Sequence, residues 1–90
     1  MNAEQYLKYL VEEIHTAVVA TVDGEGLPVT AAIDMMEFDE NGLYFLTAKG
    51  KSFYDRLTKR GYMSLTAVKG ADTMTSVAVS VRGKVRKTAQ

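Results

Sequence analysis

Two short clusters of turn-forming residues divide the first half of this chain and constrain its fold more than any other feature. Residues 23–26 (Asp-Gly-Glu-Gly) and 39–42 (Asp-Glu-Asn-Gly) each separate segments rich in β-branched and aromatic residues. Asn-Gly suits the positive φ angles of a tight hairpin turn. We therefore predict strands over residues 16–22, 27–36 and 43–47. Because the turns are short, these three strands are expected to pair in an antiparallel meander.

Helical spacing marks two further segments. Apolar residues recur on one face of residues 3–14, and Asn2 with Gln5 forms a capping-box pattern at the start. Phe53 and Leu57 lie four residues apart within residues 52–60, which are followed by a glycine suited to end a helix. Two more strands are expected over residues 62–68 and 76–85, with a bulge or bend where Gly83 interrupts the last.

The size and composition of the chain bound the kind of protein it can be. Ninety residues make one domain, and 47% hydrophobic content is enough for an apolar core. The chain has no cysteine and one histidine, so disulfides and cysteine- or histidine-rich metal sites are excluded, and we expect no metal. No segment approaches the ~20 apolar residues of a membrane span, and the N-terminus does not read as a signal peptide. We expect a cytoplasmic protein that does not contact a membrane.

The net charge of zero hides a strong asymmetry along the chain. Residues 1–48 carry nine acids and one base, whereas residues 49–90 carry ten bases and two acids. The two halves either neutralise each other within one fold, or the basic half binds an anionic ligand, or two copies dock acid to base. Nucleic acid is not an expected partner, because the whole domain is not basic and no recognition motif is present.

Residues 47–52 (Thr-Ala-Lys-Gly-Lys-Ser) join a predicted strand to a predicted helix and have the composition of a phosphate-binding loop. Hydroxyl groups, two ammonium groups and free N–H groups of a helix N-terminus would converge there. A P-loop is excluded, because its first glycine would fall at Phe45. The alternative is an ordinary turn in which Ser52 caps the helix and the lysines are solvated.

The segments FDENGLYFLTAKGKSFYDRL and SVRGKVRK resemble the pyridoxamine 5'-phosphate oxidase-like, FMN-binding split barrels. The resemblance covers about residues 16–86. It implies a mainly β fold with two helices, an antiparallel split β-barrel of α-β-β-β-α-β-β order that is incompletely closed at the C-terminus. Residues 1–90 would form a single FMN-binding domain. It would act as a homodimer with FMN at the interface.

The resemblance also implies the residues that bind FMN. The phosphate would be held by Thr47 and Lys51, with Ala48, Lys49 and Ser52 beside them. The edge of the isoalloxazine ring would be lined, largely through backbone groups, by Ala31, Ala32, Ile33 and Asp34. The true oxidases carry an arginine where this chain has Ala31. This departure argues against oxidation of pyridoxamine 5'-phosphate itself.

From this resemblance we expect a small flavin-dependent oxidoreductase in which the flavin carries the redox chemistry. The residues name neither a catalytic side chain nor the substrate and electron donor. The alternatives are a non-catalytic protein that binds or stores flavin or haem, and a degenerate dimeric barrel without cofactor. His15 could serve as a haem ligand or catalytic group, but a histidine at a surface junction is the favoured interpretation. Met35 and Met36 are expected in the core or at an interface.

Overall fold

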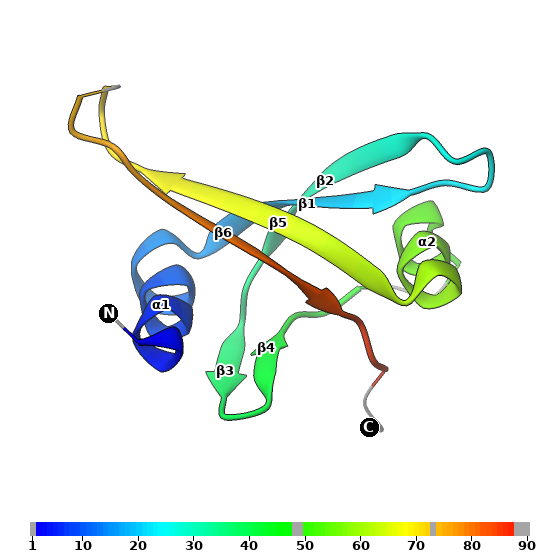
Figure 1. Cartoon of the computed structure of the whole chain (residues 1–90), viewed down its shortest axis with the longest axis horizontal. Helices are drawn as coiled ribbons and strands as arrows, with labels where there is room; N and C mark the ends of the chain where they lie inside the picture. The colour runs from blue at the N-terminus through cyan, green and yellow to red at the C-terminus, as the bar shows by residue number, and fades with distance from the viewer. Residues whose placement is uncertain (1, 48–49, 73, 88–90) are drawn as a thin grey trace.

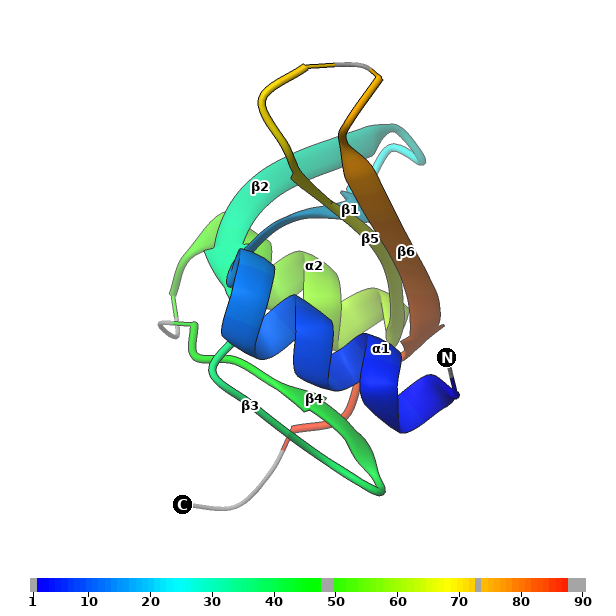
Figure 2. The same cartoon turned by 90° about the vertical axis from the view of Figure 1, so that its left-hand side faces the viewer.

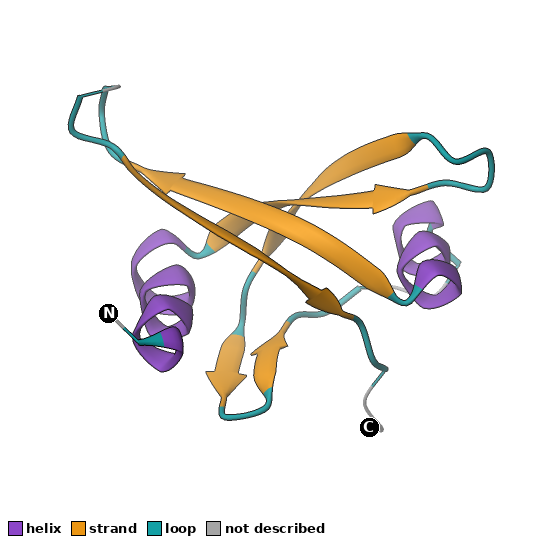
Figure 3. Ribbon diagram, in the orientation of Figure 1, coloured by secondary structure: helices purple, strands orange, loops and turns teal. Residues whose placement is uncertain are grey.

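The computed structural model describes residues 2–47, 50–72 and 74–87 and shows a mainly β fold with two helical segments (Figures 1 and 3). In chain order the elements are α1 (Ala3–Tyr9), η1 (Leu10–Ile14), β1 (Thr16–Val22), β2 (Pro28–Asp34), β3 (Glu37–Asp39), β4 (Gly42–Tyr44), α2 (Ser52–Arg60), β5 (Tyr62–Lys69) and β6 (Val77–Lys84). The two predicted helices thus have the predicted bounds, although the second part of the first, η1, is π-helical. The capping box at its start is confirmed by reciprocal bonds of 2.8 and 2.9 Å between Asn2 and Gln5.

Four antiparallel strands form the main sheet, in the order β2-β1-β5-β6. The predicted meander of three strands is wrong, because β4 pairs with β3 in a separate hairpin and not with β2. The chain leaves the sheet after Asp34, where Met35 is fully buried and its N–H donates to the His15 carbonyl at 2.7 Å. The next N–H, that of Met36, donates to the Tyr44 carbonyl at 2.9 Å and begins the hairpin. The strand predicted over residues 27–36 therefore ends at Asp34, and a separate short strand, β3, follows over Glu37–Asp39.

The sheet curves over the helices and the hairpin but does not close into a complete barrel (Figure 2). β2 and β6 are its two edges. A bulge or bend was expected at Gly83, and the β5–β6 register excludes the bulge, because it runs without interruption through the pair Met63 and Gly83. The fold is an antiparallel split barrel, as predicted.

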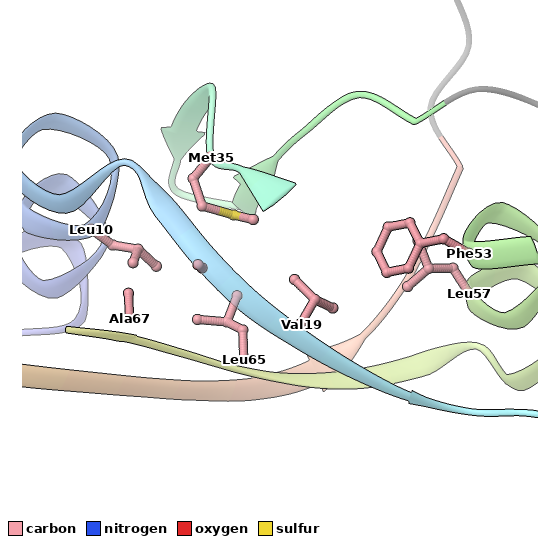
Figure 4. Close-up of a cluster of buried hydrophobic side chains, with 8 residues drawn as sticks. Leu10, Val19, Met35, Phe53, Leu57, Leu65 and Ala67 are labelled. Carbon is pink, nitrogen blue, oxygen red and sulfur yellow. The ribbon is translucent and has the colours of Figure 1, made fainter. Parts of the chain in front are cut away.

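The core lies between the concave face of the sheet and the two helices (Figure 4). Alternate residues of the central strands, such as Val19 in β1 and Leu65 in β5, point into it and are almost completely buried. Leu10 of η1 and Phe53 and Leu57 of α2 cover them. The buried residues of β1 and β5 alternate with residues that face outward.

Basic residues of the second half of the chain are bonded to the first half. Arg56 and Arg60 of α2 donate to the end of β1, at the Thr21 hydroxyl (2.8 Å) and the Val22 carbonyl (3.3 Å), and Arg60 also donates to the Asp23 carbonyl. The Lys69 ammonium lies 3.1 Å from the Glu13 carboxylate. None of the helices among the described residues has the length and apolar character to span a bilayer.

Candidate functional site

A hollow of about 320 Å³ lies at the outer edge of the sheet, where the chain passes from β2 to the hairpin. We call it the β2 hollow. It is lined by Ala32, Ile33, Asp34, Met36 and Leu46. The first three are among the four strand residues that, by the resemblance described above, are expected to line a flavin ring. The lining of the β2 hollow combines apolar side chains with the Asp34 carboxylate. Its rim is open, since Leu46 is 75% exposed.

β2 presents these residues in two ways because its side chains alternate between faces. Ala32 and Asp34 are exposed, whereas Ala31 and Ile33 pack against the core. Ala31, the fourth predicted strand residue, does not line the β2 hollow. As β2 is an edge of the described sheet, the backbone groups on its outer side have no neighbouring strand. Backbone N–H and C=O groups are therefore available beside the β2 hollow.

The predicted phosphate loop leads into α2 without a side-chain cap. Lys51 is the N-cap residue and is exposed, and its side chain makes no capping hydrogen bond. Ser52 is the first helical residue and not the cap. Thr47 is half-buried, and Ala48 and Lys49 lie outside the described residues. The first turn of α2 therefore has backbone N–H groups that the N-cap side chain does not satisfy.

A second hollow, of about 410 Å³, lies between α2 and the β1–β2 turn. It is lined by Val22, Asp23, Gly24, Ser52, Asp55, Arg56, Lys59 and Arg60. Ser52 thus lines this hollow and not the β2 hollow. Sequence reasoning missed its cations, although Arg56, Lys59 and Arg60 have the spacing of one helix face. Backbone N–H groups of Leu27 and Glu25 lower the pKa of Asp23, and both arginines lower it further.

Asp34 links the β2 hollow to the start of β1. Its Oδ1 atom accepts a hydrogen bond of 2.6 Å from the Thr16 hydroxyl, and its Oδ2 atom lies 3.7 Å from His15 Nε2. Two lining residues, Met36 and Leu46, were not predicted as site residues. Met36 was predicted as core or interface, and its exposure at the rim could not be read from a strand pattern. Leu46 is not a predicted site residue, because the pattern predicts a regular strand over residues 45–47, where the structure has none.

The chain is similar to known proteins both in sequence and in fold. Residues 3–90 match the family described as Pyridoxamine 5'-phosphate oxidase. A pyridoxine/pyridoxamine 5'-phosphate oxidase of Mycolicibacterium gilvum is 41% identical over 56 residues, which are 62% of this chain and 26% of that protein. The chain therefore spans about a quarter of the length of this relative.

Two solved structures share the fold. A conserved hypothetical protein of Mycobacterium tuberculosis, Rv2991, superposes with a TM-score of 0.76 at 18% identity, covering 93% of this chain and 51% of that one. A putative 5-nitroimidazole antibiotic resistance protein of Bacteroides thetaiotaomicron superposes with a TM-score of 0.73 at 16% identity, covering 93% and 55%. At these identities the likeness is one of fold.

Proposed function

Because this chain belongs to the pyridoxamine 5'-phosphate oxidase family, we propose that it binds FMN and acts as a small flavin-dependent oxidoreductase. The family is one of flavin-binding, oxidoreductase-like proteins. The proposal has three parts: that this chain binds FMN, that it does so at the site argued below, and that it uses FMN in redox chemistry. The flavin would supply the electron transfer, and the protein would bind and orient it.

The β2 hollow is the observation that carries this proposal. The apolar side chains of its lining and its open rim suit a flat aromatic ring, and its volume is near the lower end of the roughly 300–1,000 Å³ range of ligand pockets. The free edge of β2 offers backbone donors and acceptors of the kind that recognise the polar edge of such a ring. Ala32 and Ile33 bring no bulky polar side chain that would obstruct it.

The loop from Thr47 to Ser52 supports the proposal that the FMN phosphate binds at the start of α2. Lys51 places an exposed ammonium at the N-cap of α2, next to first-turn N–H groups that no cap side chain satisfies. An anion at such a position gains about 0.3–1 kcal/mol from the helix dipole when exposed. A charge-assisted hydrogen bond from the lysine adds about 1.5–3 kcal/mol.

The outer face of the sheet supports the proposal that two copies associate, with the cofactor between them. Small, uncharged side chains lie in a register row across all four strands: Ala32, Val18, Thr66 and Ser80. Val18 is 50% exposed on this face, and the Thr66 and Ser80 hydroxyls bond to each other at 2.9 Å. A second copy would cover this face and the open rim of the β2 hollow, which one chain leaves exposed.

Titration with FMN tests the proposal, followed by quenching of flavin fluorescence. We expect saturable binding, and we expect Lys51→Ala to raise the Kd about tenfold, the equivalent of one lost charge-assisted bond. Lys8→Ala, which removes an exposed lysine of α1, is the matched control and should leave the Kd unchanged. Absence of quenching at excess FMN would refute the proposal. Equal affinities of the two variants would refute the role of Lys51 alone.

The proposed oxidoreductase activity is tested separately, by the absorbance of the bound flavin. The flavin absorbance of the loaded protein, at about 450 nm, should bleach on addition of NADPH without oxygen and return on admission of an electron acceptor. Binding without any bleaching by NADH or NADPH would instead identify a flavin-binding protein that does not use these donors.

A further inference from the structure

The second hollow, between α2 and the β1–β2 turn (Figure 1), gathers three cationic side chains that have no carboxylate at ion-pair distance. Arg56, Lys59 and Arg60 lie on one face of the helix, and all three line this hollow. The ion pairs formed among the described residues lie elsewhere, for example between Glu13 and Lys69. Three positive charges therefore converge on one space without a direct partner.

Both arginines of the second hollow are held in place by bonds to β1 and its turn. Arg56 Nε donates to the Thr21 hydroxyl at 2.8 Å. Arg60 donates from Nε to the Val22 carbonyl at 3.3 Å and from Nη2 to the Asp23 carbonyl. Both terminal NH₂ groups of Arg56 and one of Arg60 keep no acceptor among the described residues. Guanidinium groups that are already oriented lose less conformational freedom when they bind an anion.

The second hollow also offers acceptors that a bare anion would not use. The carboxylates of Asp23 and Asp55 line it, together with Ser52 and Gly24. A carboxylate repels an anion but accepts hydrogen bonds from hydroxyl groups. The volume of about 410 Å³ is within the roughly 300–1,000 Å³ range of pockets for small organic ligands. This lining suits a ligand that has an anionic end and a body rich in hydroxyl groups.

We propose that the second hollow binds a sugar phosphate at a site separate from that of the flavin. The phosphate contacts Arg56, Lys59 and Arg60, because guanidinium and ammonium groups form charge-assisted hydrogen bonds with phosphate oxygens. The sugar hydroxyls donate to the carboxylates of Asp23 and Asp55. The β2 hollow and the second hollow have no lining residue in common, so this inference does not depend on flavin binding.

Calorimetric titration of the whole chain with ribose 5-phosphate tests the inference. A salt concentration of about 150 mM screens weak attraction to exposed charges. We expect saturable binding of ribose 5-phosphate, with a Kd at least tenfold lower than that of inorganic phosphate, and no binding of ribose. Equal affinities for ribose 5-phosphate and inorganic phosphate would show a site for the anion alone and contradict the sugar phosphate. Binding of neither compound would overturn the inference as a whole.

Two substitutions of exposed residues in the second hollow have opposite expected effects. Lys59→Gln should raise the Kd of ribose 5-phosphate about tenfold, because one charge-assisted bond is lost. Lys8→Gln, at an exposed position of α1, is the matched control and should leave this Kd unchanged. Asp55→Asn should lower the Kd of inorganic phosphate, since a repelling charge is removed. An unchanged Kd in Lys59→Gln, or weaker phosphate binding in Asp55→Asn, would contradict the proposed placement of the ligand.

FMN also carries a phosphate ester, so a last titration separates the two sites. The FMN Kd of Lys59→Gln should equal that of the wild type, and saturating ribose 5-phosphate should not displace FMN. If ribose 5-phosphate displaces FMN and Lys59→Gln weakens both ligands alike, the FMN phosphate occupies the second hollow and the separate site is wrong. If ribose 5-phosphate binds as expected and FMN does not bind, the proposed function is wrong and this inference stands.

Discussion

Thr21 is the polar residue that the described core buries, at 3% exposure, and its burial depends on one partner. Its hydroxyl accepts a hydrogen bond of 2.8 Å from Arg56 Nε, so the side chain is satisfied at the end of β1. The same arginine lies over the Phe53 ring, 5.9 Å from its centroid. Thr21 therefore fixes both the position of α2 on the sheet and the direction of an arginine that lines the second hollow.

We expect Thr21→Val to destabilise the protein by about 1–2 kcal/mol, because a part-buried guanidinium loses its acceptor while the side-chain volume is kept. Urea unfolding followed by circular dichroism measures the change. Thr30→Val, which makes the same substitution at an exposed position of β2, is the control and should stay within about 0.5 kcal/mol of the wild type. Equal stabilities of the two variants would show that the Thr21 bond contributes nothing.

At the scale of elements, residue pattern predicted the helices and most strands, because their signals are local. The capping box of α1 and the glycine that ends α2 lie within a few residues of what they define. Pairing between strands was not predictable in the same way. β1 pairs with β5, more than forty residues away, and β4 pairs with β3, whereas the pattern alone favoured a meander. The break at Met35 depends on the burial of this residue in the core that includes Leu10 of η1, which no local sequence signal indicates.

The candidate site was predictable to the extent that it lies on one strand. Ala32, Ile33 and Asp34 were expected together and do line one hollow. The rim formed by Met36 and Leu46 depends on where the chain turns after β2, so the strand pattern did not indicate it. Ser52 was expected with these residues, but α2 turns it toward the second hollow. His15 has a positive φ of 73°, which the sequence does not predict, because glycine is the residue expected in such a conformation.

The β1–β2 turn gives a prediction that depends on pH. Asp23 Oδ1 accepts hydrogen bonds from the N–H groups of Leu27 (3.0 Å) and Glu25 (2.9 Å), and these lower the pKa of Asp23 from its ordinary value of 3.8. A lowered pKa in the folded state means that the charged carboxylate stabilises the fold above pH 3.8. This contribution is lost as pH falls through the folded pKa, which lies below that value.

We therefore expect the urea midpoint of the wild type to exceed that of Asp23→Ala at neutral pH, and the difference to shrink as pH falls from about 5 to about 2.5. Asp23→Asn keeps an oxygen acceptor but does not titrate, so its midpoint should differ from that of Asp23→Ala by the same amount throughout. A wild-type advantage over Asp23→Ala that is as large in acid as at neutral pH would contradict this account of the turn.

At the scale of the whole molecule, two features of one chain suit association with a second copy. The sheet has open edges at β2 and β6, and its convex face carries small uncharged side chains near its centre. The β2 hollow opens at one of these edges. A two-fold pair of chains would bury this face and cover the hollow at once, so association and cofactor binding should fail together when the face is changed.

Val18→Lys tests this coupling, because Val18 lies in the middle of the outer face and is 50% exposed. In a two-fold interface the substitution places two ammonium groups in a desolvated contact, which costs several kcal/mol. We expect light scattering to give twice the 9.9 kDa chain mass for the wild type and a single chain mass for the variant. Circular dichroism should be unchanged, and the FMN Kd should rise at least tenfold.

Leu27→Lys is the matched control, since Leu27 is similarly exposed at 56% but lies in the β1–β2 turn, away from the centre of the face. It should keep the wild-type mass and FMN affinity. A wild-type protein that is monomeric at micromolar concentration would remove the shared interface altogether. A monomeric Val18→Lys variant with unchanged FMN affinity would separate the two properties and place the whole cofactor site within one chain.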